Sequence, residues 1–281
     1  MADDRGIRCG FIGLGSQGAP MARRMIDAGF PTVLWARRAA TLDPYRETAA
    51  TYAATVAELG DQAEHVGICV VTDDDVKQVC ADLIPAMRPG GRIAIHSTVH
   101  PDTCRDLARQ AAERGLALID APVSGGEPAA KVGALTVMVG GDAGAFAAAM
   151  PVFESFGRLI VRLGEVGAGQ HAKLINNSLL AANLGLAHAA LTAGDKLGVD
   201  RKTLAELLMA SSGRSMGVEV YARMPRPGAF QHGGALLAKD VRLLGEVLGP
   251  RDASFVPLNE TATPFLDLVK ADAGPPRPDQ S

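Results

Sequence analysis

The chain has 281 residues, of which 47% are hydrophobic and 21% are charged, and its formal net charge is -3. Such a chain can bury a large core without disulfide staples, and it has no long basic run, so we expect no nucleic-acid partner. Residues 1–8 are polar and charged and lack the apolar run of a secretion signal, so we expect a cytoplasmic protein.

A glycine-rich turn follows the first predicted strand. Residues 7–12 are mostly apolar and lead into a G-x-G-x-x-G motif, after which a helical pattern runs to Gly29. In this context the first glycine allows a tight turn, the second lets the backbone approach a pyrophosphate, and the third packs helix against strand. The motif predicts a dinucleotide site made by Gly13, Leu14, Gly15, Ser16, Gln17 and Gly18.

The second predicted strand, residues 32–36, indicates which dinucleotide. NAD sites usually place Asp or Glu after this strand, for the ribose 2′-hydroxyl, whereas arginine accommodates the 2′-phosphate of NADP. No acidic residue occurs from Ala28 to Leu42, and Arg37 and Arg38 stand where the acid would be. Because we expect no carboxylate to compete there, the sequence favours NADP over NAD.

Strand-like and helical segments alternate up to about residue 163. Further strands are predicted at residues 65–71, 92–96, 117–120, 136–139 and 158–162. This alternation is typical of an α/β fold with a mostly parallel sheet, here a Rossmann-type domain. A long helix at 169–197 and a further helix from residue 201 predict an all-α domain after it. We expect domains at 1–164 and 165–270 and a disordered tail at 271–281.

One lysine stands out in the long helical segment. From Val166 to Gly194, Lys173 is the only side chain with a formal charge at neutral pH, and Asn176 and Asn177 follow on the same helix face. Burial among apolar groups lowers the pKa of a lysine, which can then exchange protons near neutral pH. These residues alone leave open that the lysine only reaches the surface from a core helix. Polar residues interrupt the segment, which indicates a buried helix and not a membrane span.

Histidines and cysteines form no metal-binding pattern. His96 and His100 are four residues apart, but Pro101 argues against a helical metal pair, so we expect no bound metal. No C-x-x-C pair occurs, and the four cysteines are expected to be buried thiols of a reducing compartment. They are Cys9, Cys69, Cys80 and Cys104.

Four motifs, in the correct order, resemble those of the β-hydroxyacid dehydrogenases. This family includes 3-hydroxyisobutyrate dehydrogenase and tartronate semialdehyde reductase and lies in the 6-phosphogluconate dehydrogenase superfamily. The motifs are GFIGLGSQGAPMA (10–22), HSTVHP (96–101), DAPVSGG (120–126) and GAGQHAKLINN (167–177), followed by the dipeptide Lys239-Asp240. The resemblance implies an oxidoreductase that acts on small 3-hydroxy acids or on the matching semialdehydes, and the two arginines favour NADP as its cofactor.

The resemblance also implies roles for individual residues. Lys173 corresponds to the catalytic lysine, which exchanges a proton with the substrate's 3-hydroxyl while hydride passes between C3 and the nicotinamide. Asn177 would orient that lysine or the substrate, with Asn176 nearby. The substrate carboxylate would be held by a hydroxyl and backbone N–H groups, at Ser124, Gly125 and Gly126. Positions in the cofactor site match Val71, Thr72, Thr98 and Lys239.

Three features depart from the family pattern. Gln17 replaces the methionine that is common in the glycine loop. His232, followed by two glycines, stands where an aromatic residue is usual, seven positions before Lys239, which predicts a reshaped substrate pocket. The usual closing helix pattern is missing from the C-terminus.

Two other functions stay open at this stage. An imine reductase shares the fold but generally replaces the lysine, and a catalytically silent binding module would have lost Lys173 or the loop at 124–126. This sequence retains both. The long apolar helix has more hydrophobic surface than one small domain covers, so we also expect a homodimer or homotetramer.

Overall fold

The computed structural model describes residues 6–272, and the chain divides into two compact units. We call residues 1–173 the sheet unit and residues 174–281 the helical unit. Helix α7 (Ala168–Lys196) begins in the first and continues into the second. From residue 273 onward, the predicted tail lies outside the described residues.

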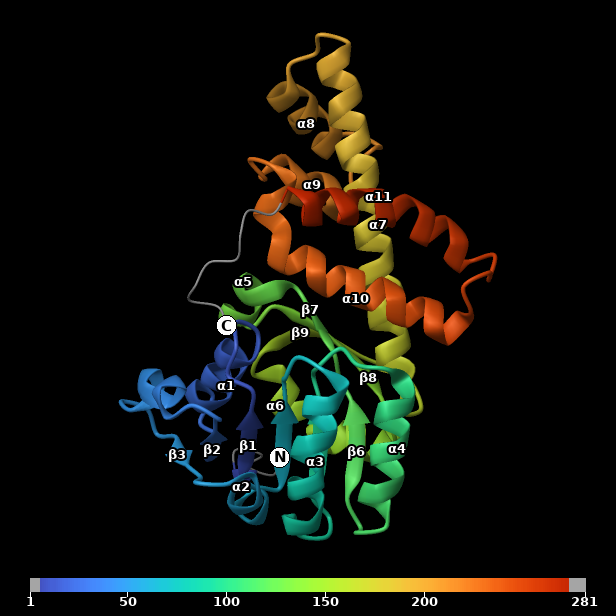
Figure 1. Cartoon of the computed structure of the whole chain (residues 1–281). Helices are drawn as coiled ribbons and strands as arrows, with labels where there is room; N and C mark the ends of the chain where they lie inside the picture. The colour runs from blue at the N-terminus through green and yellow to red at the C-terminus, as the bar shows by residue number, and fades with distance from the viewer. Residues whose placement is uncertain (1–5, 273–281) are drawn as a thin grey trace. The chain divides into compact units, whose positions relative to one another are not determined.

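A mostly parallel sheet forms the centre of the sheet unit (Figure 1). The strand order is β3-β2-β1-β4-β5-β6-β8-β7, with β9 beside β8. β8 runs antiparallel to β6 and β7, and the remaining pairs are parallel. The strands are β1 (Cys9–Ile12), β2 (Thr32–Trp35), β3 (Thr51–Tyr52), β4 (His65–Ile68), β5 (Arg92–Ile95), β6 (Ala117–Asp120), β7 (Val123–Ser124), β8 (Leu135–Gly140) and β9 (Gly157–Gly164).

Helices cover both faces of this sheet, so its central strands are buried on both sides and are almost continuously apolar. One face packs against α1 (Gly18–Asp27), α5 (Gly126–Lys131) and α6 (Ala143–Glu154). The other packs against α2 (Val56–Gln62), α3 (Asp73–Ala86) and α4 (Pro101–Ala112). The chain reverses its direction across the sheet between β1 and β4, and ligands of such sheets bind at that point, beyond the carboxyl ends of the strands.

The helical unit is built from α7 and four further helices around a separate apolar core. They are α8 (Arg201–Ala210), α9 (Met216–Ala222), α10 (Gln231–Leu248) and α11 (Phe255–Ala271). Short 3₁₀ turns, η2 (Ala39–Tyr45) and η3 (Pro227–Phe230), lie in the sheet unit and the helical unit respectively. Among the helices of residues 6–272, none combines the length and the apolar character that crossing a bilayer requires.

The predicted fold class is confirmed, and the differences are local. The sequence analysis missed β3 and β7, which have two residues each and too few positions to show a periodic pattern. It was wrong about the missing closing helix, because α11 runs to Ala271. Phe255, Phe265 and Val269 bury one side of α11, and Pro257 lies in its first turn, where proline is tolerated.

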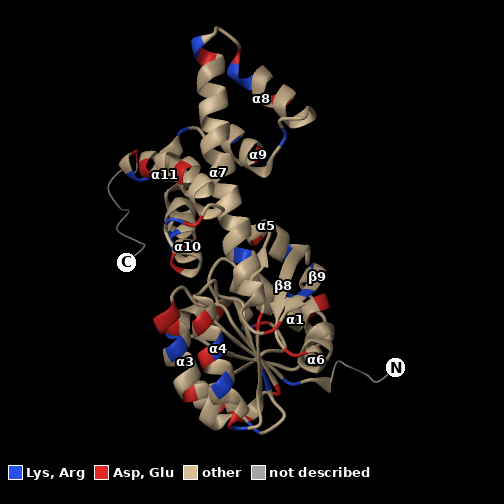
Figure 2. Ribbon diagram, turned by 90° about the vertical axis from the view of Figure 1, so that its right-hand side faces the viewer, with Lys and Arg blue, Asp and Glu red and all other residues tan. Residues whose placement is uncertain are grey.

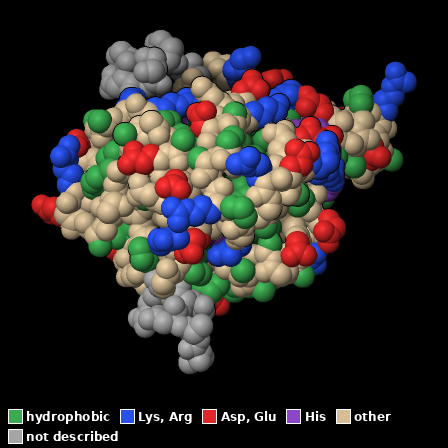
Figure 3. All heavy atoms as spheres, turned by 90° about the horizontal axis from the view of Figure 1, so that it is seen from below, with side chains coloured by type: hydrophobic (Ala, Val, Ile, Leu, Met, Phe, Trp, Pro, Cys, Tyr) green, Lys and Arg blue, Asp and Glu red, His purple; other side chains and the backbone are tan. Residues whose placement is uncertain are grey.

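Charged side chains of both signs are interspersed on the surface. Basic and acidic residues occur together along α3 and α4 (Figure 2), and on α4 they pair within one helical turn, as Arg105 does with Asp102 and Arg109 with Asp106. The face seen from below likewise mixes acidic, basic and apolar side chains (Figure 3). Such pairs keep a helix face hydrated, and because their charges are opposite, they add little net electrostatic potential to the surface.

Candidate active site at the carboxyl edge of the sheet

The glycine loop after β1 has the geometry of a phosphate cradle. Gly13 has φ +97, and a Cβ there would lie 2.1 Å from the carbonyl oxygen of Cys69. A Cβ on Gly18 would lie 1.9 Å from the carbonyl oxygen of Gly13. At Gly15, by contrast, a Cβ would meet no atom within 4 Å. Gly13 and Gly18 are therefore required by the protein's own packing. Gly15 borders open space, so a ligand can come close to the protein backbone there.

Gln17 contributes an unsatisfied polar group to this loop. It occupies the N-cap position of α1, and its side chain does not cap the helix. Its Oε1 is buried and has no hydrogen-bond partner within residues 6–272. Burying such a group without a partner costs free energy, so an amide here is suited to a ligand that supplies one.

At the same edge, the loop after β5 is hydrogen-bonded to the start of α7 and in turn holds the neighbouring loop after β4. Gln170 is fully buried, its Nε2 donates to the carbonyl oxygen of Ser97 at 2.8 Å, and its Oε1 accepts from the Val99 backbone at 3.2 Å. The Ser97 hydroxyl in turn accepts from the Val70 backbone at 2.8 Å. The loops that carry Val71 and Thr98 are thus tied together, directly beside Gln170.

Asp120, the last residue of β6, fixes the N-terminus of α7. Its carboxylate accepts from the backbone N–H of Gly167 and of Gln170, each at 2.7 Å. Burial nonetheless raises the pKa of Asp120 to about 6, against the lowering effect of these backbone donors. A carboxylate next to the free N–H groups of a helix start is electrostatically favourable. The first turns of α7, which lead to Lys173, are therefore anchored to the sheet.

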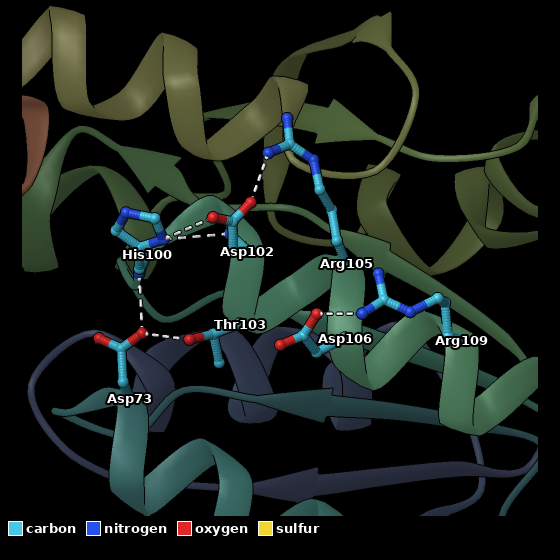
Figure 4. Close-up of polar contacts among 7 residues, drawn as sticks. All are labelled: Asp73, His100, Asp102, Thr103, Arg105, Asp106 and Arg109. Carbon is cyan, nitrogen blue, oxygen red and sulfur yellow. Dashed lines mark hydrogen bonds and ion pairs between the residues drawn. The ribbon is translucent and has the colours of Figure 1, made fainter. Parts of the chain in front are cut away.

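Asp73 holds the start of α4 in a comparable way (Figure 4). Its Oδ1 accepts from the backbone of His100 at 2.9 Å and from the Thr103 hydroxyl at 2.7 Å. The His100 side chain caps α4 by accepting from the backbone of Asp102 at 3.2 Å. His96, in contrast, points into the core, where burial lowers its pKa to about 4. Within the described chain, no cluster of three or more His, Cys, Asp or Glu side chains could hold a metal ion.

The loop predicted to bind a carboxylate follows β7. Gly125 and Gly126 both have positive φ, at +129 and +67, so the chain turns sharply immediately after Ser124. A Cβ on Gly125 would lie 2.6 Å from the Cβ of Ala129. A side chain at Gly125 would therefore be strained and would displace the loop.

Lys173 and Asn177 lie one turn apart on α7, and Lys173 is half-buried. In the helical unit, the buried Asn177 donates through Nδ2 to Oδ2 of Asp240 at 2.6 Å, and it accepts from Nδ2 of Asn176 at 3.0 Å. Oδ1 of Asp240 lies 3.3 Å from Nζ of Lys239. Asp240 thus links three of the predicted site residues: Asn176, Asn177 and Lys239.

Arg37 is placed after β2, as predicted, but the expectation that no carboxylate competes there was wrong. Its guanidinium forms an ion pair and a hydrogen bond with Asp75 of α3. The residues that flank the arginines in sequence do not reveal this partner, because Asp75 comes 38 positions after Arg37. Arg38 is exposed and makes no ion pair within residues 6–272.

The four cysteines are free thiols, three of them buried and Cys69 partly so. Burial raises the pKa of Cys9, Cys69 and Cys80 to about 12 and the pKa of Cys104 well above its ordinary value. They are protonated at neutral pH and are not nucleophiles.

The sequence analysis assigned no role to three buried residues that position the site: Asp120, Gln170 and Asp240. All three were visible in the quoted motifs: Asp120 at the start of DAPVSGG, Gln170 three residues before Lys173, and Asp240 in the dipeptide with Lys239. A polar residue in an otherwise apolar motif was the available signal, because a buried polar group needs a partner.

Comparison with known proteins agrees with this geometry. Residues 8–164 match the NAD binding domain of 6-phosphogluconate dehydrogenase, and residues 167–280 match the NAD-binding domain of NADP-dependent 3-hydroxyisobutyrate dehydrogenase. The NAD-dependent L-serine dehydrogenase of Pseudomonas aeruginosa is 36% identical over 273 residues, covering 92% of this chain and 91% of that protein.

Two solved structures show the same fold. A 3-hydroxyisobutyrate dehydrogenase of Mycobacterium tuberculosis, described with L-serine, superposes with a TM-score of 0.84 at 27% identity, over 95% of this chain and 94% of the other. Psf3, in complex with NADP+ and 2-OPP, has a TM-score of 0.82 at 26% identity, over 94% and 95% of the two chains.

Proposed function

This chain belongs to the β-hydroxyacid dehydrogenase family, and from that premise we propose that it transfers hydride between NADP(H) and C3 of a small 3-hydroxy acid, or reduces the matching semialdehyde. The coarser statement, an NAD(P)-dependent hydroxyacid dehydrogenase, follows from the family itself. One observation carries the finer proposal. Lys173 follows Gln170 by one turn, on a helix start that Asp120 and Gln170 anchor to the carboxyl edge of the sheet.

The residues of the sheet unit fit a nicotinamide dinucleotide. Gly15 leaves the space that a pyrophosphate needs, and Oε1 of Gln17, in the same loop, is buried without a hydrogen-bond partner in the described chain. When bound, the nicotinamide supplies the acceptor or donor of hydride. We assign the remaining cofactor contacts to Val71, Thr72, Thr98 and Lys239.

In this proposal Lys173 acts on the substrate's 3-hydroxyl. During oxidation Nζ takes the hydroxyl proton as the hydrogen on C3 leaves with its electron pair, and during reduction Nζ returns a proton to the new hydroxyl. Asn177, whose amide is fixed by Asp240, orients the lysine or the substrate. Ser124, Gly125 and Gly126 hold the carboxylate. A catalytically silent binding module would not require a positioned lysine beside a carboxylate-binding loop.

Two arginines support a preference for NADP(H). Arg37 and Arg38 follow β2, where guanidinium groups suit a 2′-phosphate in charge and geometry. Asp75 offsets one of these two charges, and Arg38 has no ion-pair partner in residues 6–272. We therefore expect NADP(H) to bind more tightly than NAD(H), which titration of both dissociation constants tests directly.

The substrate class is tested by a matched pair of compounds. L-serine and 3-hydroxyisobutyrate are the first candidates, because the names of the relatives contain them and both are short 3-hydroxy acids. Each is assayed with NADP+ and with NAD+, beside an analogue of equal size that lacks the carboxylate, such as L-serinamide for serine. We expect turnover of the acids only. Equal kcat/KM for acids and non-acids would contradict the carboxylate loop and favour an imine reductase.

We also propose a homodimer or homotetramer. On α7, Ile175, Leu179 and Leu186 are each more than half exposed, and their spacing places them along one side of the helix. An apolar row of this kind is typical of a surface that a partner subunit covers. Light scattering of the purified chain tests this, and a strict monomer at micromolar concentration would contradict it.

A further inference from the structure

We propose that Asp75 determines how strongly this chain prefers NADP(H) over NAD(H), because its carboxylate competes with the cofactor's 2′-phosphate for Arg37. This inference rests on the proposed use of Arg37 in cofactor binding. It concerns a residue of α3 that is distant in sequence from the glycine loop and from the arginines.

The carboxylate of Asp75 is held in place on both of its oxygens. Oδ1 accepts from Nη2 of Arg37, which completes the ion pair. Oδ2 accepts from the backbone of Thr72 at 3.2 Å and from its hydroxyl at 2.8 Å, as part of the capping box that begins α3. Because the capping box anchors Asp75, it is Arg37, whose side chain is 59% exposed, that can move toward a ligand.

The same contacts keep Asp75 charged. The hydrogen bond from Arg37, followed by those from Thr72, lowers the pKa of Asp75 below its ordinary value. At neutral pH the arginine is therefore neutralised by a fixed carboxylate. A 2′-phosphate has to share this guanidinium or displace the carboxylate, and either route weakens the attraction that the arginine offers.

The two cofactors differ in what they require from this pair. The ribose 2′-hydroxyl of NAD is neutral and leaves the ion pair intact, whereas the 2′-phosphate of NADP is anionic and needs the guanidinium. Arg37 also lines a cavity of about 320 Å³, together with Trp35, Thr55 and Asp82. Asp82 is the acidic residue of this lining, so an anionic group that enters the cavity meets a carboxylate as well as Arg37. Asp75 thus reduces the preference for NADP(H) that two arginines would otherwise produce.

The test is Asp75→Asn, which removes the charge and retains an oxygen that can accept from Thr72. Asp74→Asn is the matched control, because it removes the same charge one residue earlier from a side chain that is 96% exposed and lies 3.8 Å from Lys77. Dissociation constants for NADP+ and NAD+ are measured by titration on the full chain, and thermal unfolding checks that each variant is folded. We expect Asp75→Asn to lower the Kd for NADP+ by about threefold to tenfold and to leave that for NAD+ unchanged within about twofold.

A double variant isolates the competition. In the Arg37→Ala background, Asp75→Asn should shift the ratio of the two dissociation constants no more than Asp74→Asn does. In the chain that retains Arg37, equal shifts of this ratio by Asp74→Asn and Asp75→Asn would overturn the proposal. Weaker NADP+ binding by the Asp75→Asn variant would also overturn it, because the carboxylate would then position Arg37 for the phosphate. If the unaltered chain binds NAD+ more tightly, the proposed preference fails, yet a shift specific to Asp75→Asn still supports the competition.

Discussion

The two units of this chain hold their site residues by different means. In the sheet unit, the loops after β4 and β5 and the start of α7 are held largely through backbone groups, which donate to or accept from Ser97, Asp120 and Gln170. In the helical unit, side chains contact one another: Asn177 donates to Asp240 and accepts from Asn176, and Oδ1 of Asp240 lies 3.3 Å from Nζ of Lys239. Backbone-held loops tolerate changes in the side chains that they carry, whereas a network of side chains loses its geometry when one member is removed.

Substitution of Lys173, on the helix shared by the two units, should have the largest effect of the proposed changes, a loss of turnover. Lys173→Ala is expected to lower kcat by about two to four orders of magnitude, because it removes the proposed proton acceptor. Cofactor affinity should persist, since the glycine loop and its supports are untouched. Arginine should not restore turnover, because its guanidinium keeps its proton near neutral pH. Steady-state kinetics beside cofactor titration checks this, and a near-normal kcat for Lys173→Ala would refute the assignment.

Two glycines of one loop separate folding from binding within the sheet unit. Gly13→Ala should destabilise the fold by about 2–3 kcal/mol or more, because φ is +97 and the new Cβ would lie 2.1 Å from a backbone oxygen. Gly15→Ala has open space around it, so its free energy of unfolding should change by less than about 1 kcal/mol. Its Kd for NADP(H) should nonetheless rise about tenfold or more. Urea unfolding and cofactor titration test the pair, and a matched loss of stability in both variants would contradict it.

The sequence predicts features that depend on neighbouring residues, but it does not predict contacts between residues that are far apart in the chain. Patterns local to the chain predicted the sheet, α7 and the glycine loop, because alternation of apolar segments and spacing of glycines determine them directly. The partners of Arg37 and Asn177 could not be predicted, since Asp75 and Asp240 lie 38 and 63 positions away in sequence. Only the folded chain places these charges together, and the argument for NADP was incomplete for that reason.

Asp120 gives the sheet unit a pH dependence of known sign. Its pKa rises from 3.8 to about 6 on folding, so its contribution to stability is present in full below pH 3.8 and is lost as the pH rises through 6. The Asp120→Asn variant has no carboxyl group to ionise at this position, so it does not lose stability in this way. Relative to the unaltered chain, the variant should therefore gain about 2 kcal/mol in its free energy of unfolding between pH 4 and pH 7.

Urea unfolding of both proteins across this range measures the difference. His65 and His96 titrate in both proteins, so they cancel in the comparison. A difference that stays constant with pH would show that Asp120 has the same pKa in the folded and the unfolded chain.

Two adjacent asparagines test the helical unit, with the smallest expected effect. Asn177→Ala should lower the free energy of unfolding by about 1–3 kcal/mol, because it leaves Oδ2 of the buried Asp240 without its donor. Asn176→Ala is the control on the same helix. Within residues 6–272 its half-buried amide donates to Asn177 alone, so its loss should cost no more than about 0.5–1 kcal/mol. Urea unfolding of the two variants side by side would decide the matter: equal losses would mean that Asp240 finds another donor and that the side-chain network does not hold this part of the site.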